Sequence, residues 1–191
     1  MNEKNGQPLP DIIDDHLEVV FVGFNPGIRS AETAHHYAGR SNRFWKFLYE
    51  SGLTDKKLAP EEDQKLLEYG YGSINIVNRS TSGADGITKE EYEEGRKLLK
   101  EKLATYKPKI ACYMGIGVYK EFAQVGRVEE RGLQKDSVVP GVLDFVISSP
   151  SGRNRTPIEE QLERYKNLKR LVKELKMYSR YQNLLNSKEN C

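Results

Sequence analysis

A turn of five residues, Gly23-Phe24-Asn25-Pro26-Gly27, carries the side chain best suited to chemistry in this sequence. The turn directly follows an apolar run, and its two glycines and its proline predict a sharp bend whose backbone a ligand can approach closely. Asn25 is the side chain of this turn that can both donate and accept hydrogen bonds. Asn-Pro-Gly is also typical of an ordinary turn. The spacing matches neither a dinucleotide-binding fingerprint nor a phosphate-binding P-loop.

A second loop, Ala34–Gly39, combines an aromatic ring with two histidines. Tyr37 could fill a core, or it could serve as a platform on which a nucleobase stacks. His35 and His36 are adjacent, so their side chains diverge, and no carboxylate or thiol completes a recognisable metal site around them. We therefore expect neither a metal nor a cofactor.

A third loop, Ser148–Arg155, is rich in small polar residues and contains two arginines. It could simply lead into the final helix and present a solvated basic surface. It could also insert into DNA, with Ser151 and backbone amides binding phosphates and Arg153 at its tip. A further basic cluster, where a phosphate backbone could pass, consists of Arg40, Arg43 and Lys46.

Strand and helix patterns alternate along the chain. Buried strands are predicted at Leu17–Gly23, Ile74–Val77, Lys109–Gly115 and Leu143–Ser148. Helices are predicted at Asn42–Gly52, Leu58–Tyr69, from the capping box Thr88-x-x-Glu91 to about Lys107, at Val118–Ala123 and at Ile158–Leu175. Strands separated by helices imply crossover connections, so we predict an α/β fold: a single domain with a small, mostly parallel sheet flanked by helices. Ligands of such folds bind where the strands run into their loops.

Length and composition fit one globular domain. The chain is 37% hydrophobic and 30% charged, with a formal net charge of +2, so any charge that binds nucleic acid must be local. We place the domain at residues 16–175, between a loose segment at 1–15 and a polar, frayed tail at 176–191. Neither a membrane-spanning run nor a secretory signal is visible, which favours a cytoplasmic location, at the nucleoid or in a eukaryotic nucleus. The two cysteines, Cys112 and Cys191, predict no disulfide framework.

Four segments in order, GFNPG, HHYAG, SNRFWKFLYESGL and SSPSGRNR, resemble the mismatch-specific uracil/thymine DNA glycosylase family. The resemblance extends from about Leu17 to about Leu175 with comparable spacing. It implies the uracil-DNA-glycosylase-like fold, a small parallel sheet flanked by helices. It also implies a monofunctional enzyme of base-excision repair, which flips uracil, thymine or a damaged base opposite guanine and hydrolyses its bond to the sugar. Duplex DNA is then the partner, and we expect a monomer that does not bind membranes.

The resemblance also assigns roles in the base pocket. Asn25 matches the residue that orients the attacking water, and Phe24 contributes backbone that could donate to the base. Tyr37 matches the aromatic on which the flipped base stacks. His36 matches the thymine-processing branch, in which HHY occurs, whereas crowding near Ser30 could exclude the thymine methyl group.

Roles outside that pocket centre follow in the same way. Asn75 matches a pocket position that is Asn in some members and Lys in others. Arg153 matches the wedge that fills the gap left by the flipped base, and Ser149 departs from the Asn found in part of the family. The residues expected to bind DNA are Arg43, Lys46, Ser149, Ser151, Gly152, Arg153 and Arg155.

Two functions of other classes stay open. A non-catalytic module that binds mismatched or abasic DNA would share the same motifs. A nucleotide-binding metabolic enzyme of α/β fold is disfavoured, because the sequence has no motif that cradles phosphates or binds a nicotinamide.

Overall fold

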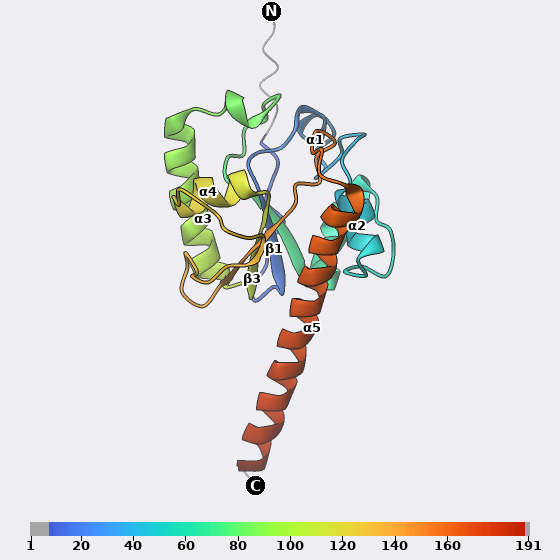
Figure 1. Ribbon diagram of the computed structural model, residues 1–191, viewed down its shortest axis with the longest axis vertical. Helices are drawn as coiled ribbons and strands as arrows, with labels where there is room; N and C mark the ends of the chain where they lie inside the picture. Colours follow the sequence, from blue (N-terminus) through green and yellow to red (C-terminus); the bar gives the residue numbers. More distant parts are fainter. Residues whose placement is uncertain (1–7, 190–191) are drawn as a thin grey trace, which may run out of the picture.

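A five-stranded sheet forms the centre of the protein in a computed structural model, which describes residues 8–189 (Figure 1). The strand order is β2-β1-β3-β5-β4. The strands are β1 (Val19–Gly23), β2 (Tyr71–Asn75), β3 (Ile110–Met114), β4 (Gly132–Leu133) and β5 (Leu143–Ile147). All neighbouring pairs are parallel except β4 with β5. This arrangement confirms the predicted α/β fold.

Helices cover both faces of the sheet. They are α1 (Ile28–Thr33), α2 (Phe44–Glu50), η1 (Pro60–Tyr69, a 3₁₀ segment), η2 (Ala84–Gly86, also 3₁₀), α3 (Lys89–Tyr106), α4 (Ile116–Ala123) and α5 (Ile158–Glu189). Helices α3 and α4 lie on one face, and α2 and α5 lie on the other (Figure 1). Because strand residues alternate between faces, Phe21 packs into the core with α2 and α5, whereas Val20 and Val22 pack into the core with α3 and α4. This two-sided burial explains why β1 is a continuous apolar run.

Several boundaries differ from the prediction. Strand β2 begins and ends earlier than Ile74–Val77, because it pairs with β1 in register from Val19 opposite Tyr71 to Gly23 opposite Asn75. Helix α1 lies between the turn Gly23–Gly27 and the loop Ala34–Gly39, where the sequence predicted no helix. Strand β4 is only two residues long, too short for a sequence pattern.

The described part of the N-terminal segment is not loose. Ile12 exchanges two backbone hydrogen bonds with Ser73 on β2, at 2.9 and 2.8 Å. Leu9 and Ile12 are both buried. The short segment from Leu9 to Ile12 therefore belongs to the domain, because its apolar side chains and its backbone complete the edge of the sheet. Residues 1–7 lie outside the described residues.

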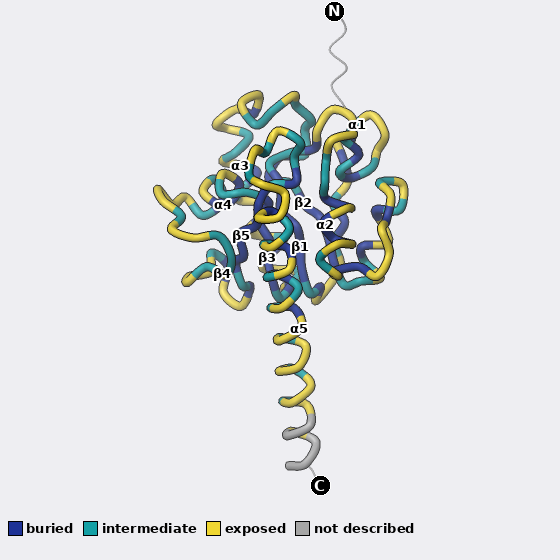
Figure 2. The backbone as a smooth tube through the Cα atoms, turned by 45° about the vertical axis from the view of Figure 1, so that its right-hand side comes forward, coloured by how far each residue is buried: buried dark blue, intermediate teal, exposed yellow. Residues whose placement is uncertain are grey.

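The C-terminal residues also differ from the prediction of a frayed tail. Helix α5 does not end near Leu175 but continues to Glu189, and the mostly exposed stretch that follows its partly buried first half extends away from the body (Figure 2). Met177, Tyr178 and Tyr181 are exposed on it. No glycine or proline interrupts the sequence between Leu175 and Glu189, so the helical hydrogen bonds continue. Among residues 8–189, no helix has both the length and the apolarity needed to cross a membrane.

Candidate functional site

A pocket of about 350 Å³ opens at the carboxyl edge of the sheet. Residues at the ends of four parallel strands line it: Gly23 on β1, Asn75 on β2, Met114 on β3 and Ser149 after β5. β1 pairs with β2 on one side and with β3 on the other, so the chain changes direction across the sheet here. Open parallel sheets bind ligands at such a point. The volume suits a ligand no larger than a nucleobase with part of its sugar.

The pocket brings together most of the residues predicted from the sequence. Those that line it are Phe24, Asn25, Ser30, His36, Tyr37, Asn75, Ser149 and Ser151. Those that do not are Arg43, Lys46, Gly152, Arg153 and Arg155. No aspartate, glutamate or lysine stands among the described residues that line the pocket. Any proton transfer or nucleophilic attack there must therefore proceed without a carboxylate base or a lysine nucleophile.

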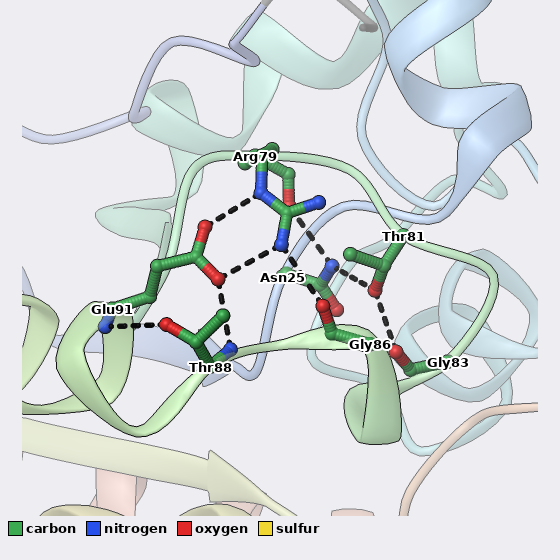
Figure 3. Close-up of polar contacts among 7 residues, drawn as sticks. All are labelled: Asn25, Arg79, Thr81, Gly83, Gly86, Thr88 and Glu91. Carbon is green, nitrogen blue, oxygen red and sulfur yellow. Dashed lines mark hydrogen bonds and ion pairs between the residues drawn. The ribbon is translucent and has the colours of Figure 1, made fainter. Parts of the chain in front are cut away.

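Asn25 is held in one orientation by the segment that follows β2 (Figure 3). Its Nδ2 donates to the carbonyl oxygen of Arg79 at 2.9 Å and to Oγ1 of Thr81 at 2.7 Å. A carbonyl oxygen can only accept, so this contact fixes which end of the amide is nitrogen. Within residues 8–189, Oδ1 of Asn25 accepts no hydrogen bond. The side chain thus offers the pocket an acceptor that a water molecule can use.

His36 and Tyr37 belong to a buried chain of hydrogen bonds. His36 Nε2 lies 2.8 Å from the carbonyl oxygen of Pro10, and His36 Nδ1 lies 3.1 Å from Oγ of Ser73. Burial lowers the pKa of His36 below its usual value, so the ring is neutral at pH 7. Nε2 must then donate to Pro10, and Nδ1 must accept from Ser73. Ser73 Oγ is consequently left to accept from the Tyr37 hydroxyl, 2.6 Å away.

The Tyr37 ring stacks on Phe44 and also lines the pocket. Its centroid lies 3.7 Å from that of Phe44, with the two rings stacked at 29°. Burial raises the pKa of its hydroxyl well above the usual range, so the group keeps its proton. Tyr37 also has φ of 55°, a left-handed conformation that is uncommon outside glycine. Such a backbone conformation persists where the surrounding structure holds a residue in one position, as a ring used for stacking requires.

Three further predicted residues shape the pocket walls. Phe24 packs its ring against Tyr92 on α3, with centroids 6.0 Å apart, and its carbonyl oxygen accepts from the Val77 amide at 2.9 Å. Ser30 Oγ accepts from the Ala38 amide at 3.1 Å, which ties α1 to the histidine loop. Asn75 comes close to β1, because a Cβ added to Gly23 would lie 2.8 Å from its Oδ1. A larger residue at Gly23 would therefore push Asn75 from its place.

The loop Ser148–Arg155 is shaped mainly by its own residues. Asn154 Nδ2 donates to the Ser149 carbonyl at 2.8 Å, and the Arg153 amide donates to Ser151 Oγ at 3.3 Å. Arg43, the residue before α2, supports the loop: its amide donates to the Pro150 carbonyl at 2.9 Å and its Nη1 to the Ser151 carbonyl at 3.2 Å. The predicted phosphate-binding role of Arg43 thus competes with a role in holding this loop.

The remaining predicted residues lie around the rim. Arg153 and Arg155 are exposed. A Cβ added to Gly83 would lie 3.3 Å from Nη1 of Arg153, so this loop meets the segment that holds Asn25. Gly152 packs on Ser41, and Lys46 is paired with Glu50 on the same helix at 3.8 Å.

Sequence reasoning missed several pocket residues. Leu9 comes from the segment thought to be loose, and Met114 ends a strand that was read only as buried core. Arg29 lies on the unpredicted helix α1, and its Nε donates to the Ala38 carbonyl at 2.9 Å. No local pattern marks these residues, because each reaches the pocket only through tertiary packing.

Among residues 8–189, no group of three or more His, Cys, Asp or Glu side chains could hold a metal ion. Cys112 is fully buried on β3, and burial raises the pKa of its thiol well above the usual value. It therefore behaves as a small apolar core residue.

The model of the uracil DNA glycosylase superfamily matches residues 10–176 of the chain. The chain belongs to this superfamily. A solution NMR structure from Methanosarcina acetivorans, of a protein provisionally named a uracil DNA glycosylase, shares the fold. Its TM-score is 0.59 at 20% sequence identity, over 88% of this chain and 98% of that chain. Membership in the uracil DNA glycosylase superfamily supports DNA glycosylase activity and DNA as the partner.

Proposed function

We propose that the protein is a monofunctional DNA glycosylase that removes uracil, and more slowly thymine, opposite guanine. The carrying observation is the fixed amide of Asn25 in a pocket without a carboxylate or a lysine. The pocket fits one base, so the target nucleotide must leave the helix before it can react. Lack of a pocket lysine argues for a single activity, because a lyase step would need an amine nucleophile.

The proposed reaction is hydrolysis of the bond between the base and C1′ of the sugar. Oδ1 of Asn25 accepts a hydrogen bond from a water molecule and directs the water oxygen at C1′. The C1′–N1 bond breaks with both electrons going to the base, the water oxygen bonds to C1′, and the released proton ends in solvent or on the base. A neutral amide is a weak base, so most of the rate must come from stabilising the departing anion by fixed N–H dipoles. Turnover is therefore expected to be slow.

We assign base recognition to Tyr37 and His36, which also line the pocket. Tyr37 offers a fixed ring for stacking, and His36 is neutral with both ring nitrogens engaged. His36 therefore contributes shape rather than a proton. Buried Ser30 and His36 leave little freedom for the wall to move around a thymine methyl group. One methyl group changes binding by only about 1–3 kcal/mol, so thymine is a slower substrate rather than an excluded one.

We assign the preference for mismatched base pairs to residues at the rim of the pocket. Arg153 is proposed to fill the gap left by the flipped nucleotide and to contact the unpaired guanine. Filling the gap offsets an unstacking cost of a few kcal/mol. Uracil opposite guanine is also held less firmly than a Watson–Crick pair, which lowers the cost of flipping it.

The test is a set of duplexes with uracil, thymine or hypoxanthine opposite guanine or adenine, incubated with excess protein. We expect abasic product from uracil opposite guanine first and from thymine opposite guanine more slowly. Tight binding of these duplexes without any abasic product would support the alternative, a non-catalytic module for mismatched or abasic DNA. Preference for free nucleotides over duplexes would support a metabolic enzyme instead.

A further inference from the structure

The amide of Asn25 depends on two acceptors that lie in one loop, residues 76–88, between β2 and α3. Thr81 Oγ1 has a single proton and donates it to the Gly83 carbonyl at 2.5 Å, so toward Asn25 it can only accept. The Arg79 carbonyl can also only accept. If the amide rotated by half a turn, Oδ1 would face two acceptors and repel both. The orientation of the Asn25 amide therefore depends on the conformation of this loop.

The side chain of Arg79 closes the loop on itself. Its Nη2 donates to the Gly86 carbonyl at 2.9 Å, across the loop (Figure 3). Its Nε and Nη2 donate to the two carboxylate oxygens of Glu91, at 2.5 and 2.8 Å. This paired geometry restricts rotation as well as distance. The same residue thus provides one acceptor for Asn25 and ties that acceptor to the end of the loop and to the first turn of α3.

Glu91 is in turn held by the start of α3. Its Oε2 accepts from the Thr88 amide at 2.8 Å, and its own amide donates to Thr88 Oγ1 at 3.2 Å, which completes a capping box. The Arg79 guanidinium and the Thr88 amide lower the pKa of Glu91 to about 2, so it stays ionised. Helix α3 is seated tightly against the end of β2, because a Cβ added to Gly95 would lie 2.2 Å from the Ile76 carbonyl oxygen. Helix α3 therefore holds the Arg79–Glu91 pair in place and, through the 76–88 loop, the orientation of Asn25.

We propose that Arg79 and Glu91 are positioning residues for catalysis, which hold the Asn25 amide in its reactive orientation through the 76–88 loop. This inference rests on the proposed function for its effect on rate. The side chains of Arg79 and Glu91 are 41% and 28% exposed, and ion pairs this exposed contribute little to global stability. Their loss should therefore affect the order of the loop, and with it Asn25, far more than folding.

The main test is Arg79→Ala, compared with Arg96→Ala. Arg96 pairs with Glu121 between α3 and α4, away from the pocket, with side chains 19% and 29% exposed. The control thus removes an arginine from an ion pair of the same helix. We expect Arg79→Ala to lower the single-turnover rate on uracil opposite guanine by about 10- to 100-fold, since small misplacements of a reactive group cost this much. Binding of an uncleavable duplex and the melting temperature should change no more than in Arg96→Ala.

A second readout does not depend on activity. The side-chain amide protons of Asn25, assigned by their loss in Asn25→Ala, should exchange slowly with solvent in the wild-type protein. They should exchange much faster in Arg79→Ala and remain protected in Arg96→Ala. Glu91→Gln, which keeps the shape of the side chain, should show the same change to a smaller degree and covers the case in which Arg79→Ala does not fold.

The two readouts separate the proposals. A slower reaction together with faster exchange supports the positioning role. A rate unaffected by Arg79→Ala, or a slower rate with Asn25 exchange unchanged, would overturn it. If the wild-type protein cleaves no duplex, the proposed function fails, and the exchange measurement alone still decides whether Arg79 orders Asn25.

Discussion

Two segments beside the pocket, the turn Gly23–Gly27 and the loop Ser148–Arg155, use their polar side chains in different ways. Asn25 donates both amide protons to residues 54 and 56 positions away in the sequence. In the loop Ser148–Arg155, Ser149, Ser151 and Asn154 bond to neighbours two to five residues away, and the arginines are left exposed. The Asn25 side chain is therefore fixed by distant residues, while the loop Ser148–Arg155 is shaped mainly by its own side chains, with support from Arg43, and presents its charges outward.

This difference matches two physical tasks. A group that directs a water molecule must be in place before the substrate arrives, since reorganising it would add to the barrier. A side chain that enters DNA must adapt to a flexible partner. The contacts that order it therefore form in the complex and not in the free protein. The contrast predicts that changes around Asn25 reduce the chemical step, whereas changes in the other loop reduce DNA binding or stability.

Asn25→Ala should produce the largest effect. Loss of the amide removes the acceptor for water, and we expect the single-turnover rate on uracil opposite guanine to fall by at least about 100-fold, as for the loss of one positioned polar group in other active sites. Affinity for an uncleavable duplex should change little. A normal cleavage rate would remove Asn25 from the mechanism, and a comparable loss of affinity would break the contrast between the two loops.

Much of the fold could be predicted from the sequence because its signals are local. Each buried strand is an apolar run, and Thr88 with Glu91 marks the start of α3 by capping chemistry alone. The segment Leu9–Ile12 carried no such signal. It is ordered by two backbone hydrogen bonds to Ser73, a residue more than sixty positions away, and by burial against the finished sheet.

The site shows the same division. Asn25, Tyr37 and Asn75 stand in turns or at strand ends, where sequence patterns are informative. Arg79 does not, because its role depends on the meeting of its side chain with Glu91 across a loop. Gly152 was predicted to contact DNA as part of the Ser148–Arg155 loop. The structure provides a different reason for a glycine there.

Gly152→Ala should produce the next largest effect, on stability. A Cβ at this position would lie 2.3 Å from Oγ and 2.4 Å from Cβ of Ser41, so the Ser148–Arg155 loop must move away from it. Such overpacking costs typically about 1–3 kcal/mol of unfolding free energy. Gly126→Ala is the matched control, because no atom lies within 4 Å of its added Cβ. Chemical denaturation measures both variants, and equal stabilities would show that the loop is softer than its contacts indicate.

Arg153→Ala should weaken binding to uracil–guanine duplexes and to abasic product by about tenfold, the range expected for one arginine at a DNA interface. The saturated single-turnover rate should change less, since Arg153 does not line the pocket. Arg127→Ala removes an exposed arginine from the segment after α4 and is the control for the loss of charge. Fluorescence anisotropy at two salt concentrations measures the affinities. If both variants weaken binding equally, Arg153 acts only through its charge and the wedge assignment is wrong.

The pH dependence of stability provides the smallest effect, and it concerns the buried His36 in the wall of the pocket. His36 has a folded-state pKa below its usual value of 6.5, because burial disfavours its charged form. Below pH 6.5 the unfolded chain therefore binds more protons than the folded one, and this histidine makes unfolding easier as the pH falls. The Asp63 carboxylate accepts from the His36 amide at 2.9 Å and lies 3.6 Å from His35, so the variant is compared with wild type at each pH. We expect unfolding free energies measured from pH 7 to pH 5 to decline less steeply in His36→Asn than in wild type.

The control His16→Asn removes an exposed histidine and should keep the wild-type slope. Equal slopes in all three proteins would mean that His36 binds its proton equally well in the folded and the unfolded chain, so that burial does not disfavour its charged form.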